Sequence, residues 1–189
     1  MTIRASGTVE TELPQIRGYQ ITEQLYAGSR TIVYRAIVIA SQRPVVVKLL
    51  RSEFPTFDEV IQFRNQYAIA QHLDLWGVVK LYSIDAWGNR DLLVMEDFGG
   101  VSLDAYLKQS ESKPMTIQLF LTIALQLVET LDDLHRNNIV HKDLKPSNIL
   151  IHPETHQIKL IDFSIASSLP RETQENPSGL RGTLAYIAP

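Results

Sequence analysis

The residues best suited to chemistry lie in the stretch His141–Asn148, which reads His-Lys-Asp-Leu-Lys-Pro-Ser-Asn. Asp143 stands five residues before Asn148, a spacing that can place a base and a metal ligand on one loop. Asp162 follows a mostly apolar run, and Lys48 follows three valines. An isolated charged residue is usually a solvated surface group, but a lysine within a β-branched run fits that role poorly. These positions indicate acid–base chemistry beside a metal-binding loop.

Local patterns predict the elements that must hold these residues. Alternating and β-branched runs predict five strands, over residues 19–25, 32–39, 45–50, 79–86 and 91–96. Thr56 and Glu59 form a capping box, which predicts a helix from Thr56 to about Leu73. Apolar residues at helical spacing predict a second helix over 116–137, followed by short strands over 149–151 and 158–161. Residues 1–17 are polar and unpatterned, so we expect a loose leader there.

The composition places the chain among globular proteins. Its 189 residues are 44% hydrophobic and 21% charged, which excludes an intrinsically disordered chain. The absence of cysteine excludes disulfides, a cysteine nucleophile and cysteine-held zinc. A formal net charge of −3 gives no electrostatic basis for binding nucleic acid. The N-terminus lacks the apolar run of a signal peptide, and no run of about 18 apolar residues occurs, so we expect no membrane span and a cytoplasmic location.

Four motifs occur in the order of the protein-kinase signature. They are Val45-Val46-Val47-Lys48, the stretch 141–148, Asp162-Phe163-Ser164, and the closing Gly182-Thr183-Leu184-Ala185-Tyr186-Ile187-Ala188-Pro189. From residue 18 to residue 189 the chain therefore resembles a eukaryotic-type protein kinase domain, and Lys-Pro at 145–146 and Gly-Thr at 182–183 resemble its serine/threonine branch. The resemblance implies an α+β, bilobal fold. A five-stranded N-lobe would span 18–97, and the first part of a helical C-lobe would span 98–189 and end within the activation segment.

The same resemblance implies ATP- and Mg²⁺-dependent phosphorylation of serine or threonine on a protein substrate, in signal transduction. In such a site Asp143 accepts the proton of the substrate hydroxyl, and Lys145 steadies the transferred phosphoryl group. Asn148 and Asp162 hold Mg²⁺, and Lys48 binds the α- and β-phosphates. This fits the needs of phosphoryl transfer, which depends on charge neutralisation and alignment more than on covalent chemistry.

A nucleotide site is implied as well. Four apolar side chains would surround adenine, a methionine would lie behind them, two residues would offer backbone groups to the adenine edge, and two would serve the phosphates. In that order they are Leu25, Val33, Val46, Leu150, Met95, Glu96, Phe98, Gly28 and Gln66. The apolar members can equally be plain core residues, and the two roles are compatible.

Three departures from the family pattern leave alternatives open. The phosphate loop, Tyr26–Val33, keeps only the middle glycine, Gly28. Gln66 stands where the family has the glutamate that pairs with Lys48, and Ser164 replaces a glycine. These changes motivate a second interpretation, a regulatory pseudokinase that binds nucleotide without transfer. A third is a non-catalytic interaction module of another fold.

Two segments resemble those of a bacterial subgroup. In that subgroup the kinase domain opens a long signalling protein with downstream sensor and histidine-kinase modules, and the similar segments are 25–31 and 161–167. We therefore expect downstream modules of the same polypeptide as partners. Since Pro189 falls inside the family's Ala-Pro-Glu motif, we also expect the 189 residues to be an incomplete, inactive piece of the domain.

Overall fold

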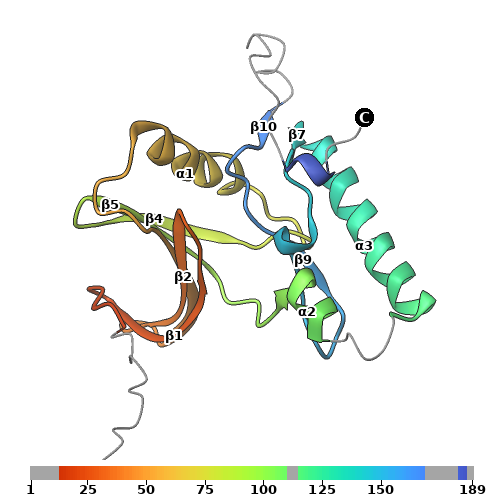
Figure 1. The fold of residues 1–189 in the computed structure, drawn as a ribbon, viewed down its shortest axis with the longest axis horizontal. Helices are drawn as coiled ribbons and strands as arrows, with labels where there is room; N and C mark the ends of the chain where they lie inside the picture. The colour runs from red at the N-terminus through yellow and green to blue at the C-terminus, as the bar shows by residue number, and fades with distance from the viewer. Residues whose placement is uncertain (1–12, 110–114, 169–182, 187–189) are drawn as a thin grey trace, which may run out of the picture.

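The computed structural model describes residues 13–109, 115–168 and 183–186, which form two lobes (Figure 1). The first lobe is a five-stranded antiparallel sheet with one helix packed on it. Its elements are β1 (Tyr19–Ala27), β2 (Thr31–Val38), β3 (Arg43–Leu50), α1 (Phe57–Ala70), β4 (Leu81–Trp87) and β5 (Arg90–Glu96). The bilobal α+β fold with a five-stranded N-lobe is confirmed.

The sheet order is β1-β2-β3-β5-β4, so β3 lies at the centre and pairs with β2 and β5. Because strand residues alternate between faces, one face carries Tyr34, Ala36, Val45, Val47, Leu49, Leu92 and Val94, which form a buried cluster. The opposite face carries Val33, Val46 and Lys48, with Met95 directly across from Val46. The pleat thus sends the side chains of Val33, Val46, Lys48 and Met95 to a single face.

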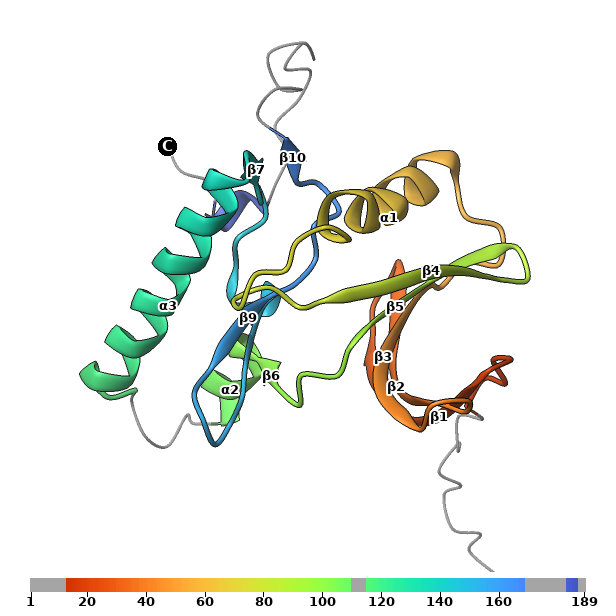
Figure 2. The same cartoon turned by 180° about the vertical axis from the view of Figure 1, so that it is seen from behind.

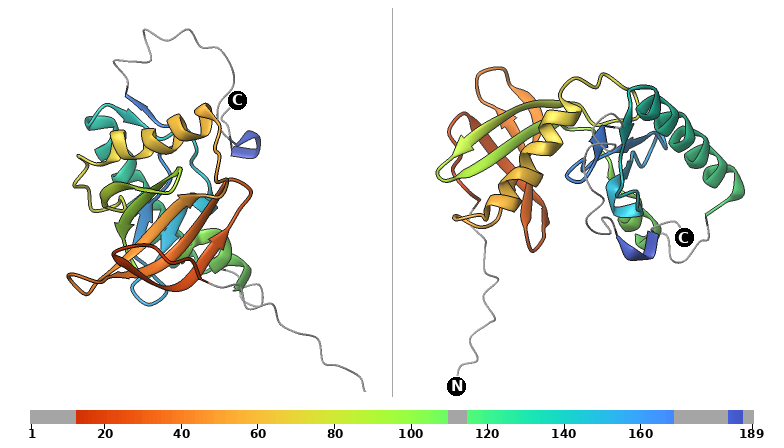
Figure 3. Two further views of the ribbon diagram at one scale, coloured as in Figure 1. Left: turned by 90° about the vertical axis from the view of Figure 1, so that its left-hand side faces the viewer. Right: turned by 90° about the horizontal axis from the view of Figure 1, so that it is seen from above.

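Helix α1 begins as the sequence predicts. Thr56 accepts a hydrogen bond from the Glu59 amide, and the Glu59 side chain accepts one from the Thr56 amide. The helix ends at Ala70, with Gln71 as its C-cap, rather than near Leu73. Buried Phe63 packs against the sheet, and Figure 3 shows the helix lying across the strands.

In the described residues the second lobe is built from two helices, a three-stranded sheet in the order β6-β8-β9 and the two-stranded pair β7–β10. Its elements are β6 (Val101–Ser102), α2 (Leu103–Gln109), α3 (Ile117–Arg136), β7 (Ile139–Val140), the 3₁₀ turn η1 (Pro146–Asn148), β8 (Ile149–Ile151), β9 (Ile158–Leu160), β10 (Ser167–Ser168) and the 3₁₀ turn η2 (Leu184–Tyr186). Figure 2 shows α3 on the side of this lobe that faces away from the sheet. The pieces β6, α2, β7, β10 and the turns were not predicted, because each is too short to show a period.

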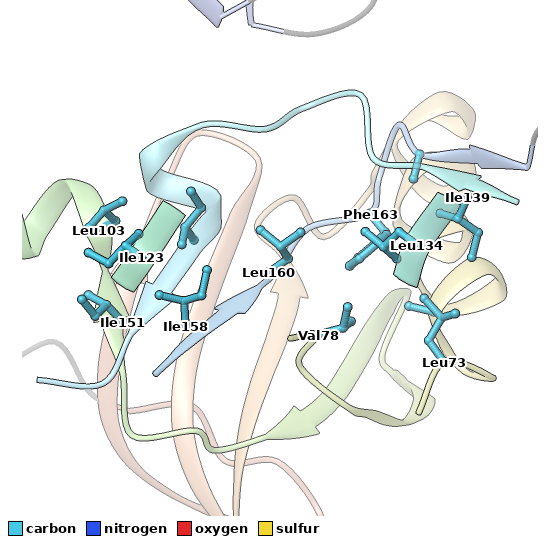
Figure 4. Packing of buried hydrophobic residues seen from close by; sticks show 13 residues of the cluster. Leu73, Val78, Leu103, Ile123, Leu134, Ile139, Ile151, Ile158, Leu160 and Phe163 are labelled. Atoms are coloured by element: carbon cyan, nitrogen blue, oxygen red, sulfur yellow. The ribbon is translucent and has the colours of Figure 1, made fainter. Parts of the chain in front are cut away.

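One apolar core fills the second lobe and reaches into the first. It combines Ile123 and Leu134 of α3 with Ile151, Ile158 and Leu160 of the β8–β9 pair (Figure 4). Ala70 at the end of α1 belongs to the same cluster. The end of α1 is therefore anchored on the second lobe.

The segment before β4 explains why that strand starts at Leu81 and not at Val79. Leu160 of β9 donates its amide hydrogen to Gly77 O, and its carbonyl accepts the Val79 amide. Gly77 also lies so close to α3 that an added Cβ would stand 1.8 Å from Thr130 Oγ1. The backbone at 77–79 thus makes its hydrogen bonds to the second lobe, and pairing with the first-lobe sheet begins only after it, at Leu81.

The extent of the expected leader needs correction. Ile16 was assigned to the leader, but only 6% of it is exposed and it packs against the first-lobe sheet. Residues 1–12 lie outside the described part. On α3, the side chains of Phe120, Leu121 and Leu125 are exposed. No helix in the described residues is long and apolar enough to cross a membrane.

Candidate active site

The Lys48 side chain of β3 contacts both helix α1 and the second lobe. Its side chain is nearly buried, and Nζ donates a hydrogen bond of 2.9 Å to Gln66 Oε1 of α1. The same Nζ lies 3.3 Å from Asp162 Oδ2, beyond β9. The sequence placed Gln66 opposite Lys48, and the structure has that contact. The ammonium group therefore has one charged partner, the Asp162 carboxylate, and one neutral partner, the Gln66 amide.

Asp162 has a strained backbone and one carboxylate oxygen without a hydrogen-bond partner among the described residues. Its φ of 66° lies in the left-handed region, where a non-glycine residue is uncommon. Burial acts to raise the pKa of its carboxyl, but the Lys48 ammonium and the neighbouring Ser164 outweigh burial and lower it. Within the described residues, the buried Oδ1 has no hydrogen-bond partner. An ionised carboxylate with one buried oxygen free has the properties of a metal ligand.

Asp143 is held from several sides. Oδ1 accepts a hydrogen bond of 2.6 Å from Thr183 Oγ1, and Oδ2 accepts one of 2.9 Å from Asn148 Nδ2. Lys145 Nζ lies 2.7 Å from Oδ2 and also donates to Thr183 Oγ1. Burial acts to raise the pKa of Asp143, but these neighbours together lower it, so the carboxylate is ionised at neutral pH.

His141 links the loop that carries Asp143 to the segment that carries Asp162. The Asp143 amide donates to His141 Nδ1, so the ring proton lies on Nε2, which donates to Ile161 O at 3.0 Å. Burial lowers the pKa of His141, against the opposing effects of the Ile161 carbonyl and the nearby aspartates. The ring packs on Phe163 with centroids 4.7 Å apart. A neutral imidazole thus ties the Asp143 loop to the Asp162 segment.

The oxygen donors of Asn148 and Asp162 fit a hard cation such as Mg²⁺. The Ile161 amide donates to Asn148 O at 3.0 Å, which brings the two stretches together. Asn148 Nδ2 donates to Asp143, which directs the amide nitrogen toward the base and leaves Oδ1 on the other side. Mg²⁺ prefers such oxygen ligands and takes its remaining ligands from substrate phosphates and water.

The residues expected around adenine come from both lobes. Val33, Val46 and Met95 share one face of the sheet, and Leu150 comes from β8 in the second lobe. All four side chains remain partly accessible. Leu25 falls at a register shift of β1 and is 39% exposed.

The phosphate loop has an arrangement of its own. The Gly28 amide donates to Thr31 O at 2.9 Å, which closes the β1–β2 turn. A Cβ on Gly28 would stand 2.5 Å from the hydroxyl of Tyr26, so this exposed ring would have to move if a larger residue replaced the glycine. Gly28 is not among the glycines with positive φ, so the backbone conformation at this position does not itself require glycine.

Several contacts around the site were not predicted. Lys159 of β9 places Nζ 2.7 Å from Glu96 Oε2, so the Glu96 side chain is engaged and not only its backbone. Arg35 of β2 bonds Asp97 at 2.8 Å, and Asn65 of α1 bonds the segment after Phe163. Each contact joins residues more than 60 positions apart, and no short sequence pattern reveals it.

Comparison with known proteins places this chain in a family. Residues 19–189 match the protein kinase domain family. The chain is 31% identical over 172 residues to a probable serine/threonine-protein kinase of Clostridium acetobutylicum, and 33% identical over 172 residues to serine/threonine-protein kinase PrkC of Bacillus subtilis. It is 36% identical over 177 residues to serine/threonine-protein kinase D3 of Mus musculus. These alignments cover 90% of this chain but 26%, 26% and 19% of the relatives.

Proposed function

The chain belongs to the protein kinase family, and on that premise we propose that it transfers the γ-phosphoryl group of ATP to serine or threonine of a protein substrate. The observation that carries the proposal is the Asp143 cluster. The carboxylate is ionised and held in place by Thr183, Lys145 and Asn148. The serine/threonine-protein kinases among the relatives support this choice of acceptor.

The residues divide the work in a way that follows from their charges. Asp143 accepts the proton of the attacking hydroxyl, and Lys145 offsets negative charge on the transferred group. Lys48 orients the α- and β-phosphates from the sheet side. Asn148 and Asp162 hold Mg²⁺, which neutralises phosphate charge when bound.

Adenine binds, in this proposal, between the sheet and β8. Leu25, Val33, Val46 and Leu150 supply apolar contacts, with Met95 behind them. Backbone groups of Glu96 and Phe98 reach the adenine edge. Gly28 of the phosphate loop lies against the phosphates, and Gln66 acts on them through Lys48. The partial exposure of the apolar members supports the assignment, because ligand-contacting side chains must be accessible.

The setting of the domain is also a proposal. The chain spans about a quarter of the length of the two bacterial relatives. We place it within a larger cytoplasmic signalling polypeptide, and the segments 25–31 and 161–167 support a sensor protein of the hybrid histidine kinase kind. The pseudokinase alternative is not favoured, because the Lys48, Asp143, Asn148 and Asp162 set is intact and the relatives are named as kinases.

The test is transfer of labelled phosphate from ATP to a generic protein acceptor by the full-length protein, with and without Mg²⁺. Phosphoserine or phosphothreonine formed only with Mg²⁺ supports the proposal. Thermal stabilisation by ATP without any transfer would instead establish nucleotide binding alone, since a ligand that binds the native state raises its stability.

A further inference from the structure

Helix α1 contacts the segment after Phe163 through one side chain. Asn65 Nδ2 donates to Ser164 O at 3.2 Å and to Ala166 O at 3.1 Å. Both partners are carbonyls, which only accept, so the amide nitrogen must face them. Asn65 is partly buried, and its two bonds span 99 and 101 residues of sequence.

These bonds close a ring around the site. Gln66, the next residue of α1, accepts from Lys48, and Lys48 pairs with Asp162. Asp162 precedes Ser164 by two residues, and Ser164 returns to α1 through Asn65. Successive helix residues point about 100° apart, so one turn of α1 presents Gln66 to β3 and Asn65 to the second lobe.

The Gln66 link is the weak point of this ring. A neutral amide holds an ammonium group less firmly than a carboxylate does, because one of the two charges is missing. Nothing in the pairing of Lys48 and Gln66 alone fixes the helix on the segment that carries Asp162. The two bonds from Asn65 supply that attachment directly, at the adjacent position of the same helix.

We propose that Asn65 is a positioning residue, which holds α1 against residues 164–166 and thereby keeps Lys48 aligned between Gln66 and Asp162. It touches no substrate and acts through the Lys48 cluster. The inference rests on the proposed kinase function for its effect on ATP, but the attachment of α1 is a property of the nucleotide-free protein.

The experiment compares Asn65→Ala and the isosteric Asn65→Asp with Gln62→Ala in the full-length protein. Gln62 lies one turn earlier on α1 and makes none of these hydrogen bonds, so its replacement removes the same kind of side chain without breaking the ring. Hydrogen–deuterium exchange is measured without nucleotide over 57–70, 163–168 and the control hairpin 19–38. Steady-state kinetics then give KM for ATP and kcat.

Both Asn65 variants should raise exchange in 57–70 and 163–168 by about tenfold, which corresponds to about 1.4 kcal/mol, and leave 19–38 unchanged. The KM for ATP should rise by a similar factor, and adding Gln66→Glu to Asn65→Ala should lower it again by two- to fivefold. The proposal is overturned if both Asn65 variants match Gln62→Ala in exchange, or if Gln66→Glu gives no rescue. Exchange reports on the attachment even if the protein transfers no phosphate, so failure of the proposed function is recognised separately.

Discussion

The loop around Asp143 and the strand end at Asp162 hold their carboxylates in different ways. Asp143 accepts hydrogen bonds from Thr183 and Asn148 and lies against Lys145, so both oxygens are engaged. Asp162 meets Lys48 through Oδ2 alone, and its buried Oδ1 has no partner among the described residues. Both groups have lowered pKa values, so both are ionised, but only one has an oxygen to spare.

The difference suggests how one site can separate two tasks. A base must stay where the substrate hydroxyl arrives, and several hydrogen bonds fix its orientation. A metal ligand must keep an oxygen free, which costs stability because a buried, unpaired oxygen is unfavourable. The left-handed backbone of Asp162 is a further cost at the same residue. We therefore expect substitutions at the two aspartates to separate proton transfer from metal binding.

The largest expected effect is that of Asp143→Asn. The amide cannot accept the substrate proton, so kcat should fall by about 10²–10⁴. ATP affinity should stay within about twofold of wild type, because Asp143 is assigned no nucleotide contact. Labelled-phosphate transfer and calorimetric ATP binding measure the two quantities. Full activity in this variant would remove Asp143 from the base role.

Asp162→Asn should produce the complementary pattern. Loss of the free carboxylate oxygen weakens Mg²⁺ binding, and metal ions contribute several kcal/mol to such reactions, so transfer should fall by roughly 100-fold. The Mg²⁺ concentration for half-maximal activity should rise, whereas in Asp143→Asn it should not. If Asp162→Asn left the Mg²⁺ requirement unchanged, Asp162 would not be the metal ligand, and the proposed difference between the two aspartates would be wrong.

Thr183→Ala should have a smaller effect, which is seen best as a function of pH. The Thr183 hydroxyl is one of the hydrogen bonds that lower the pKa of Asp143, so its removal should raise that pKa. A carboxylate must be ionised to act as a base, so the acid limb of kcat/KM should move to higher pH. At neutral pH the loss should be about tenfold, since a hydrogen bond to a charged group contributes about 1.5–3 kcal/mol.

Thr183→Ser is the matched control, because it keeps the hydroxyl and removes only a methyl group. Its acid limb should coincide with that of the wild type. If Thr183→Ser and Thr183→Ala shift the limb equally, the hydroxyl is not what sets the pKa of Asp143.

Sequence reasoning reached the parts of this site that rest on local patterns. The β-branched run that carries Lys48, the capping box of α1 and the Asp143–Asn148 spacing are each visible within a few residues. The contact of Gln66 with Lys48 was also expected, through the family pattern and not through any local rule. The hydrogen-bond partners of Asp143 and Asp162, which determine which carboxylate oxygen has no partner, were not predicted. They depend on tertiary packing, which no local pattern reveals.

The rest depends on pairs that are distant in sequence. Asn65 bonds to Ser164 and Ala166 across 99 and 101 residues, and Ala70 of the same helix packs in the core of the second lobe. Lys159 reaches Glu96 because β9 lies beside the junction of the lobes, and residue 159 by itself looks like any surface lysine in a short strand. The late start of β4 has the same kind of origin, since Gly77 and Val79 bond to Leu160.

The smallest effect tests the one neutral partner on the Lys48 side. Gln66→Glu replaces the Lys48–Gln66 hydrogen bond with an ion pair, and a charged partner is stronger by about 1 kcal/mol. Gln66 is buried, so desolvation of the new carboxylate offsets part of that gain. We expect a two- to fivefold fall in the KM for ATP, with kcat changed by less than twofold. Gln66→Ala, which removes the partner, should raise KM instead. A folded Gln66→Glu variant with unchanged or higher KM would mean that Lys48 is already held by Asp162 alone, and that the asymmetry between the two aspartates, not the identity of residue 66, governs the site.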